Sequence, residues 1–199
     1  MSSNQAATLT PRQIDLVVEY IHANSDTPER DELMFALSHY AGLRVSEIAK
    51  LNLDTAMLDA EGRVPPMRSR PLIRIMSNVG KMKKAREIPM HQAVHDALRA
   101  FVKRHPDLNY IAFAPRKNMA RMSVHNLTMW FWNTYKRAGL QNCSSHSGRR
   151  SFATRSARKL NQHGMHLRDL QLYLGHARLD TTQRYLEPSD GGHNLIGSL

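Results

Sequence analysis

The sequence predicts a mainly helical fold with one small antiparallel β-hairpin. Apolar residues recur at helical spacing along most of the chain, and strand-like segments stand out only at 72–76 and 86–89. The chain has 199 residues, 41% hydrophobic and 23% charged, a balance typical of a globular protein. No linker or internal repeat divides it. We therefore expect a flexible N-terminus over 1–10, a single domain over 11–187 and a C-terminal tail over 188–199.

The first helices have clear start and stop signals. Thr10-Pro11-Arg12-Gln13 offers an N-cap, a proline at the first helical position and a glutamine at N3, which predicts a helix near 11–23. Thr27-Pro28 repeats the start signal, and Gly42 ends the second helix. A short third helix is expected from Ser46 to Leu51.

The middle of the chain changes character. Residues 53–71 hold Gly62 and three prolines without any period, which predicts a loop. The two strands that follow flank a basic turn, SNVGKMKKA, and this hairpin is the only convincing β element, although a short strand is also expected at 110–113. Further helices are expected at about 91–104, 123–138, 147–160 and 167–174.

The charge balance indicates a polyanionic partner. Lys and Arg number 28 against 17 Asp and Glu, giving a net charge of +11. Nucleic acid is favoured over an anionic membrane, because no basic amphipathic helix stands out. A soluble basic protein without such a partner is the alternative.

Several classes of protein are disfavoured by what the sequence lacks. The single cysteine, Cys143, cannot form an intrachain disulfide or a thiolate metal site. No acidic cluster has metal-ligand spacing, which disfavours a metal site. The start, MSSNQAATLT, has no export signal, and no apolar run approaches a membrane span, so the expected compartment is the cytoplasm.

Basic residues gather in two places. Four fall in the predicted turn, namely Lys81, Lys83, Lys84 and Arg86; five fall on one predicted helix, namely Arg149, Arg150, Arg155, Arg158 and Lys159. His146 and Arg149 are three residues apart, so they face the same side of a helix and could clamp one phosphate. A solvated charged face is the alternative for either run.

Five short motifs carry a resemblance to a known family. They are GLRVSEI at 42–48, GKMKKAREIP at 80–89, HSGRRSFAT at 146–154, LGH at 174–176, and Tyr185 nine residues after His176. In this order they resemble the first arginine box, the hairpin lysine, the HxxR box, the LGH box and the nucleophilic tyrosine of the tyrosine recombinase (phage integrase) family. The resemblance implies that family's catalytic-domain fold, of the DNA breaking-rejoining enzyme type.

The resemblance assigns three residues to the scissile phosphate. Arg44 and Arg149 would hold it, and His176 would be a further donor. Transfer of a phosphodiester to a phenol requires charge stabilisation on the non-bridging oxygens, and two guanidiniums can supply it where a nuclease would use metal ions.

The resemblance assigns three more residues to nucleophilic attack and proton transfer. Tyr185 would attack, His146 would act as general base or proton shuttle, and Lys81 would be the hairpin acid. A phenol with a pKa of about 10 needs a base or nearby cations to ionise, and the leaving 5′-oxygen needs a proton. DNA contacts are expected from Lys83, Lys84, Arg86, Arg150 and Arg155.

The implied function is site-specific recombination of double-stranded DNA through a 3′-phosphotyrosine, with no metal and no nucleotide cofactor. The implied assembly is a homotetramer on two DNA sites, with accessory DNA-bending proteins as further candidate partners and a bacterial, archaeal or phage origin. The alternatives are DNA relaxation of the type IB topoisomerase kind, a catalytically idle DNA-binding regulator, and a histidine-metal nuclease.

Two features depart from the family pattern. Gly148 precedes Arg149 where the family usually has an apolar residue, so we expect weaker local packing and about 1 kcal/mol less helix propensity. Only about 40 residues precede Arg44, so the chain resembles a catalytic domain that stands alone. Arg44 could also pair with Glu47 as a helix-surface ion pair, and His176 could simply be a helix C-terminal histidine.

Overall fold

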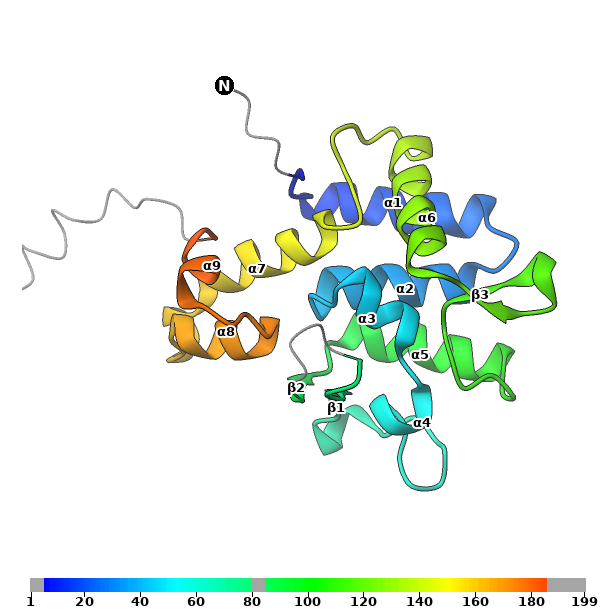
Figure 1. The fold of residues 1–199 in the computed structure, drawn as a ribbon, viewed down its shortest axis with the longest axis horizontal. Helices are drawn as coiled ribbons and strands as arrows, with labels where there is room; N and C mark the ends of the chain where they lie inside the picture. Colours follow the sequence, from blue (N-terminus) through cyan, green and yellow to red (C-terminus); the bar gives the residue numbers. More distant parts are fainter. Residues whose placement is uncertain (1–5, 80–84, 186–199) are drawn as a thin grey trace, which may run out of the picture.

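A computed structural model describes residues 6–79 and 85–185 (Figure 1). The α-helices in these ranges are α1 Pro11–Asn24, α2 Pro28–Tyr40, α3 Val45–Lys50, α4 Leu53–Ala56, α5 Gln92–Arg104, α6 Val124–Arg137, α7 Ser147–Lys159, α8 Leu167–Leu174 and α9 Leu179–Gln183. The short 3-10 helices are η1 Met67–Ser69, η2 Pro115–Lys117 and η3 Asn161–His163. The strands are β1 Leu72–Ile75, β2 Arg86–Pro89, β3 Phe113–Ala114 and β4 Ala120–Arg121. The predicted fold class, mainly helical with small antiparallel sheets, is confirmed.

The helices that sequence signals predicted begin where those signals lie. Thr10 caps α1 in a full capping box with Gln13, and Pro11 occupies the first helical position. Ser123 caps α6 by accepting a hydrogen bond from the backbone N–H of Asn126 at 3.1 Å. These caps satisfy N–H groups that have no partner within the helix.

Several short elements were missed or misassigned from the sequence. The stretch 53–71 contains α4 and η1 in addition to loop, and α9 follows α8. The strand expected at 110–113 is reduced to an isolated bridge between Asn52 and Tyr110, and a second hairpin, β3 with β4, begins at Phe113. Elements of two to five residues are too short to show a hydrophobic period, so pattern alone does not reveal them.

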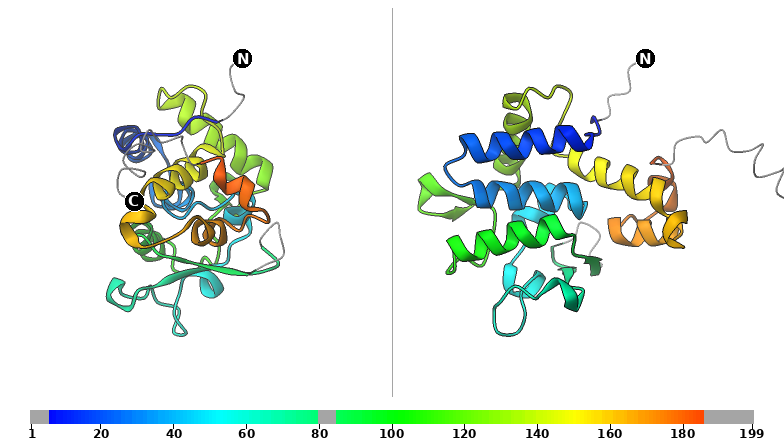
Figure 2. Two further views of the ribbon diagram at one scale, coloured as in Figure 1. Left: turned by 90° about the vertical axis from the view of Figure 1, so that its left-hand side faces the viewer. Right: turned by 180° about the vertical axis from the view of Figure 1, so that it is seen from behind.

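The helices form a main body and a smaller lobe. In the body α2 lies between α1 and α5, and the hairpin of β1 and β2 lies below them (Figures 1 and 2). The lobe contains α8, α9 and the far end of α7, and it has its own small apolar cluster: Ala153, Ala157, Leu160, Leu170 and Leu174. Because α7 packs on α2 and also joins α8, it connects the two parts.

Gly148 has a different effect from the one expected. It lies on the face of α7 that packs against α2, and a Cβ there would be 2.2 Å from the Ser38 hydroxyl. The glycine therefore permits close packing instead of weakening it, and it places the start of α7 directly on the body.

Candidate active site

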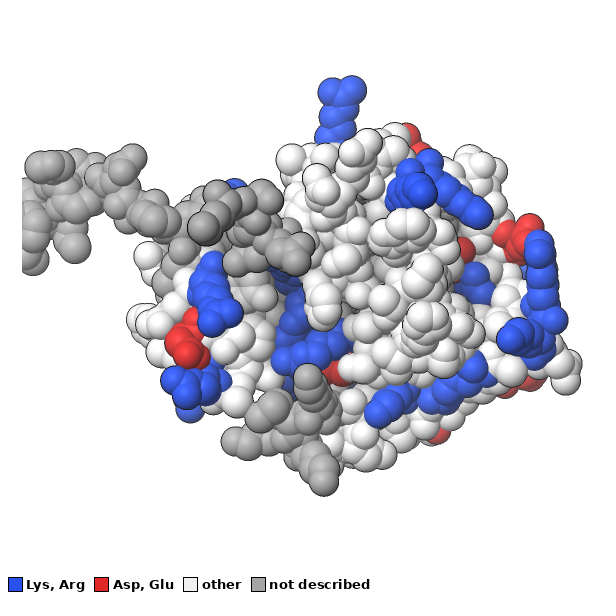
Figure 3. Space-filling model, turned by 45° about the horizontal axis from the view of Figure 1, so that its top comes forward, with Lys and Arg blue, Asp and Glu red and all other residues white. Residues whose placement is uncertain are grey.

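The predicted site residues converge where α3 begins, α7 begins and α8 ends. Arg44 is the residue before α3, Arg149 lies in the first turn of α7, and His176 follows the C-terminal cap of α8. Figure 3 shows Lys and Arg side chains gathered near the middle of one face of the molecule. The body supplies α3 and the lobe supplies α8, so the site lies at their junction.

Three successive carbonyls at the end of α8 each accept a hydrogen bond from a different arginine. Arg86 Nε donates to Tyr173 O at 2.8 Å. Arg149 Nη2 donates to Leu174 O, and Arg44 Nη2 donates to Gly175 O at 3.3 Å. Carbonyls at a helix C-terminus have no partner within the helix and carry the negative end of its dipole, so guanidiniums are well suited to them.

Arg149 is the most enclosed of these arginines. Only 5% of it is exposed, and its Nη1 also donates to Gly42 O at 2.6 Å. Burial lowers its pKa to about 9, and the charges of Arg44 and Arg86 act in the same direction. The guanidinium is therefore still protonated at pH 7, and it links the loop before α3 to the end of α8.

Gly42 has a conformation that few other residues could adopt. Its φ is +64°, and a Cβ there would be 2.4 Å from the Phe152 ring on α7. The loop that carries Arg44 is thus held against α7 on one side of Arg149.

Glu47 lies at the centre of the arginine group. Its side chain is fully buried, and its carboxylate accepts hydrogen bonds from the backbone N–H and Nη1 of Arg44 at 2.8 and 3.0 Å. It also accepts two from Arg86, at 3.0 and 2.8 Å. Burial raises the pKa of Glu47, but the hydrogen bonds and charges of Arg86 and Arg44 outweigh it, so the pKa lies below its usual value. The pair of Arg44 and Glu47 exists, but it is not a surface ion pair.

The rings of His176 and Tyr185 are nearly parallel. Their ring centroids are 6.1 Å apart and their planes differ by 15°. His176 Nδ1 is 2.9 Å from Thr182 Oγ1, a hydrogen bond that orients the imidazole. Burial, together with Arg149, Arg44 and Arg86, lowers the pKa of His176 to about 4, so the ring is neutral at pH 7.

Tyr185 is half-buried against the apolar side of the lobe. Like Phe152, Met165 and Leu167, it packs against the buried apolar cluster of the lobe. A negative charge on Tyr185 would raise the pKa of Arg149.

His146 lies at the start of α7, three residues before Arg149. It is the residue before α7 and is exposed, with its backbone N–H donating to Ser144 Oγ at 3.3 Å. The structure thus groups Arg44, Arg149, His176 and Tyr185 and leaves His146 open to solvent at the edge. The predicted hairpin residues Lys81, Lys83 and Lys84 lie outside the described residues.

The three remaining arginines predicted to contact DNA donate hydrogen bonds within the protein. The Arg86 side chain is only 9% exposed. Arg150 Nη1 donates to Ala6 O at 3.0 Å. Arg155 donates to His39 O, and its guanidinium lies 5.4 Å from the centroid of the Tyr40 ring. Sequence reasoning missed the role of Glu47 and Arg86 together, because only the fold buries this carboxylate between the two cations.

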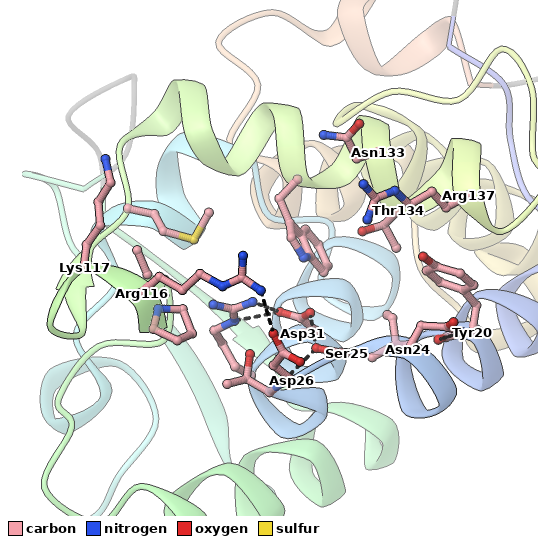
Figure 4. A pocket seen from close by; sticks show the side chains of 17 residues that line it. Tyr20, Asn24, Ser25, Asp26, Asp31, Arg116, Lys117, Asn133, Thr134 and Arg137 are labelled. Atoms are coloured by element: carbon pink, nitrogen blue, oxygen red, sulfur yellow. Dashed lines mark hydrogen bonds and ion pairs between the residues drawn. The ribbon is translucent and has the colours of Figure 1, made fainter.

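A hollow of about 430 Å³ lies where α1 ends and α2 begins (Figure 4). Its floor carries a buried ion pair of Arg30 with Asp31 at 2.6 Å, and Arg116 reaches Asp26 at 3.5 Å. Every predicted catalytic residue that the structure describes lies away from its lining. This hollow is therefore separate from the candidate active site.

The described residues contain neither a cluster of metal ligands nor a membrane-spanning helix. Over 6–79 and 85–185, no three His, Cys, Asp or Glu side chains come together as metal ligands. In the same ranges, no helix has both the length and the apolar character needed to cross a membrane.

Comparisons with known proteins identify the family. Residues 7–191 match the phage integrase family. The tyrosine recombinase XerA of Thermococcus kodakarensis is 32% identical over 161 residues, which are 80% of this chain and 51% of the relative. The tyrosine recombinase XerD of Shewanella oneidensis is 30% identical over 195 residues, which are 93% of this chain and 58% of the relative. This chain spans little more than half the length of these curated relatives.

Solved structures share the fold. A crystal structure of XerA recombinase superposes with a TM-score of 0.71 at 20% identity, covering 100% of this chain and 64% of that one. The Tn1549 transposon integrase in complex with a circular intermediate DNA gives a TM-score of 0.74 at 20% identity, covering 100% and 67%. The XerH recombinase bound to its difH substrate gives 0.72 at 20% identity, covering 97% and 54%.

This chain therefore has the fold of a tyrosine recombinase catalytic domain, as its motifs predicted. It belongs to the phage integrase family.

Proposed function

We propose that this chain is a site-specific DNA recombinase that cleaves and rejoins DNA through a 3′-phosphotyrosine at Tyr185. The observation that carries the proposal is the near-parallel arrangement of the His176 and Tyr185 rings, 6.1 Å apart, near Arg149 and Arg44. The family relatives are named as tyrosine recombinases, which favours recombination over relaxation by a topoisomerase or a merely regulatory role.

In this proposal Arg44 and Arg149 bind the non-bridging oxygens of the scissile phosphate. Both guanidiniums are fixed by backbone carbonyls before substrate arrives, so little reorganisation is needed when charge develops. His176 adds a neutral donor at Nε2 in the tautomer in which its Nδ1 accepts a hydrogen bond from the Thr182 hydroxyl, 2.9 Å away. We propose this tautomer for the substrate complex, because a hydroxyl can donate as well as accept and the phosphate requires a donor.

Proton transfer completes the cycle. Tyr185 loses its proton, with His146 as the general base or shuttle, and its oxygen attacks phosphorus. The 5′-oxygen leaves and takes a proton from Lys81. Because the phosphotyrosine keeps the energy of the broken phosphodiester, the reverse attack by a 5′-hydroxyl rejoins DNA without a nucleotide or metal cofactor.

Double-stranded DNA is the proposed substrate. The XerH and Tn1549 integrase structures are described as bound to difH substrate and to circular intermediate DNA, which supports the same partner here.

We further propose that Lys83 and Lys84 contact the DNA backbone. The assembly would be a tetramer on two duplexes, aided by accessory DNA-bending proteins, and it would act in the cytoplasm of a bacterial, archaeal or phage-infected cell. Residues 11–187 would form the single catalytic domain, and 188–199 would dock on a neighbouring protomer. The flexibility expected for 1–10 does not extend to its described part, because Leu9 is buried and its backbone N–H donates to Ser151 Oγ at 2.8 Å.

Covalent capture on DNA of random sequence tests the proposed function and finds the target at the same time. The full chain is incubated with labelled duplexes that contain a randomised segment, and SDS-resistant adducts are recovered, sequenced and reselected. We expect wild type to enrich one sequence class, Tyr185→Phe to give no adduct, and Tyr173→Phe, a control on α8, to behave as wild type. No enrichment by wild type, or an adduct that survives Tyr185→Phe, would contradict the proposal. Relaxation of supercoiled plasmid without strand exchange would identify a topoisomerase instead.

A further inference from the structure

We propose that Arg86 is a positioning residue that keeps the positive charge of Arg44 available to the phosphate by neutralising Glu47. This inference rests on the proposed function for its role in catalysis. It replaces the prediction that Arg86 itself contacts DNA, because its side chain is only 9% exposed and faces Glu47.

The Glu47 carboxylate accepts more side-chain hydrogen bonds from Arg86 than from Arg44. Arg86 binds both carboxylate oxygens, one with each terminal nitrogen, at 3.0 and 2.8 Å. The Arg44 side chain binds one oxygen, through Nη1 at 3.0 Å. A bidentate guanidinium pair is the stronger arrangement, so Arg86 is the main partner of the carboxylate.

Other contacts fix Arg86 in this orientation. Its Nε donates to Tyr173 O at 2.8 Å, so each of its three guanidinium nitrogens makes a hydrogen bond. Gly175 lies close enough that a Cβ there would be 3.2 Å from Arg86 Cδ. Arg86 thus joins β2 of the body to the end of α8, next to His176.

The consequence is electrostatic. Arg44, Arg86 and Arg149 with Glu47 carry a net charge of +2 at pH 7, since His176 is neutral. A phenolate attacking a phosphodiester brings two negative charges to the reaction centre. Without Arg86 the group would carry +1, and Glu47 would have Arg44 as its remaining cationic partner. The positive charge of Arg44 would then be neutralised by Glu47 instead of by the phosphate of the substrate.

Arg74 offers a matched control on the same hairpin. It lies on β1, is 51% exposed and forms only a loose pair with Glu87, at 3.6 Å. Replacing Arg74 by methionine removes one positive charge and shortens the side chain, as Arg86→Met does. It leaves the hydrogen bonds of Glu47 unchanged. A general effect of net charge on DNA binding would appear in both variants.

The test is a charge rescue. The variants are Arg86→Met, Arg86→Lys, Arg86→Met with Glu47→Gln, and Arg74→Met; the probe is the duplex that wild type enriches by covalent capture. We expect Arg86→Met to lower the rate of adduct formation at saturating DNA by about 10–100-fold. The double variant, which restores the +2 charge and leaves no buried carboxylate, should recover most of that rate. Arg86→Lys should fall between, and Arg74→Met should remain within about twofold of wild type.

A second readout separates this inference from the proposed function. Inorganic phosphate is titrated against each variant in a thermal-shift assay, with chloride at matched ionic strength. We expect phosphate to stabilise wild type and the double variant, and Arg86→Met much less. If wild type forms no adduct, the proposed function fails while the phosphate series still tests Arg86. The inference is overturned if Arg86→Met keeps wild-type phosphate affinity, or if the double variant is no better than Arg86→Met, which would mean a purely structural role.

Discussion

Gly148 on α7 lies so close to Ser38 on α2 that a Cβ at position 148 would be 2.2 Å from the Ser38 hydroxyl oxygen. The same Cβ would be 2.9 Å from His39 Cδ2, so the crowding comes from two successive residues of α2. The next residue after Gly148 is Arg149. The close approach of α7 to α2 therefore helps to position Arg149, whose guanidinium donates a hydrogen bond to Gly42 O.

Gly148→Ala should destabilise the protein although alanine is the better helix former. Overpacking costs about 1–3 kcal/mol, which exceeds the gain in helix propensity of about 1 kcal/mol. Gly164→Ala is the control, because that glycine has φ +63° and open space around it, so only backbone strain of about 1 kcal/mol is expected. Urea denaturation measures both. A Gly148→Ala protein as stable as wild type would show that α7 does not need this contact.

Ser38→Ala should partly relieve Gly148→Ala. It removes the hydroxyl oxygen at 2.2 Å and leaves the Ser38 Cβ at 2.8 Å, so recovery is incomplete. The same urea series gives the coupling energy between the two positions, and additive effects would contradict direct contact.

His39 makes folding stability depend on pH. It is fully buried, its Nε2 is 2.8 Å from the Tyr135 hydroxyl, and within the described residues its Nδ1 has no hydrogen-bond partner. Burial, aided by Arg155, lowers its pKa from 6.5 to about 3. The fold thus disfavours the charged ring, so stability is complete above pH 6.5 and is lost as pH falls towards 3. From this residue we expect about 2 kcal/mol less stability at pH 5 than at pH 7.

Denaturant unfolding of wild type and His39→Gln at the two pH values checks this expectation. The variant should lose about 2 kcal/mol of the pH dependence, whatever its stability at pH 7. The remaining dependence would come from His91, His105 and His176, whose pKa values are also lowered by burial. His22→Gln is the control, since that side chain is 52% exposed. An unchanged difference in His39→Gln would contradict a neutral, buried His39.

Replacing Arg155 should lower the free energy of unfolding more than it weakens DNA binding. Its guanidinium donates to His39 O and lies over the Tyr40 ring, so Arg155→Met should cost about 1–2 kcal/mol of unfolding free energy. The slope of log affinity against log salt for duplex DNA should change by less than about 0.5. Lys84→Met, at a proposed DNA contact, should reduce that slope by about 1. Equal slopes in the two variants would place Arg155 on the DNA after all.

Local signals and tertiary environment explain what the sequence could and could not predict. The capping box at Thr10 and the cap at Ser123 are encoded within four residues, so α1 and α6 were located closely. The hairpin of β3 with β4 pairs only two residues on each strand, which leaves no pattern to detect.

The candidate active site also has features that the sequence encodes locally and features that depend on tertiary packing. Motif spacing identified Arg44, Arg149 and His176, and the structure brings them together at the end of α8. The spacing gave no sign that Arg86 turns inward, because a basic residue in a basic turn has the same sequence signature whether it meets DNA or a buried carboxylate. Only the packing of β2 against α8 decides between them.

The central claim is that Tyr185 becomes joined to DNA, and mass spectrometry of the adduct tests it most directly. Wild-type adduct is digested with nuclease and trypsin, and cleavage after Arg184 releases a peptide that begins with Tyr185 and contains no other tyrosine. We predict a nucleotide linked through its 3′-phosphate to this peptide. A nucleotide on any other residue, or attachment through a 5′-phosphate, would contradict the account.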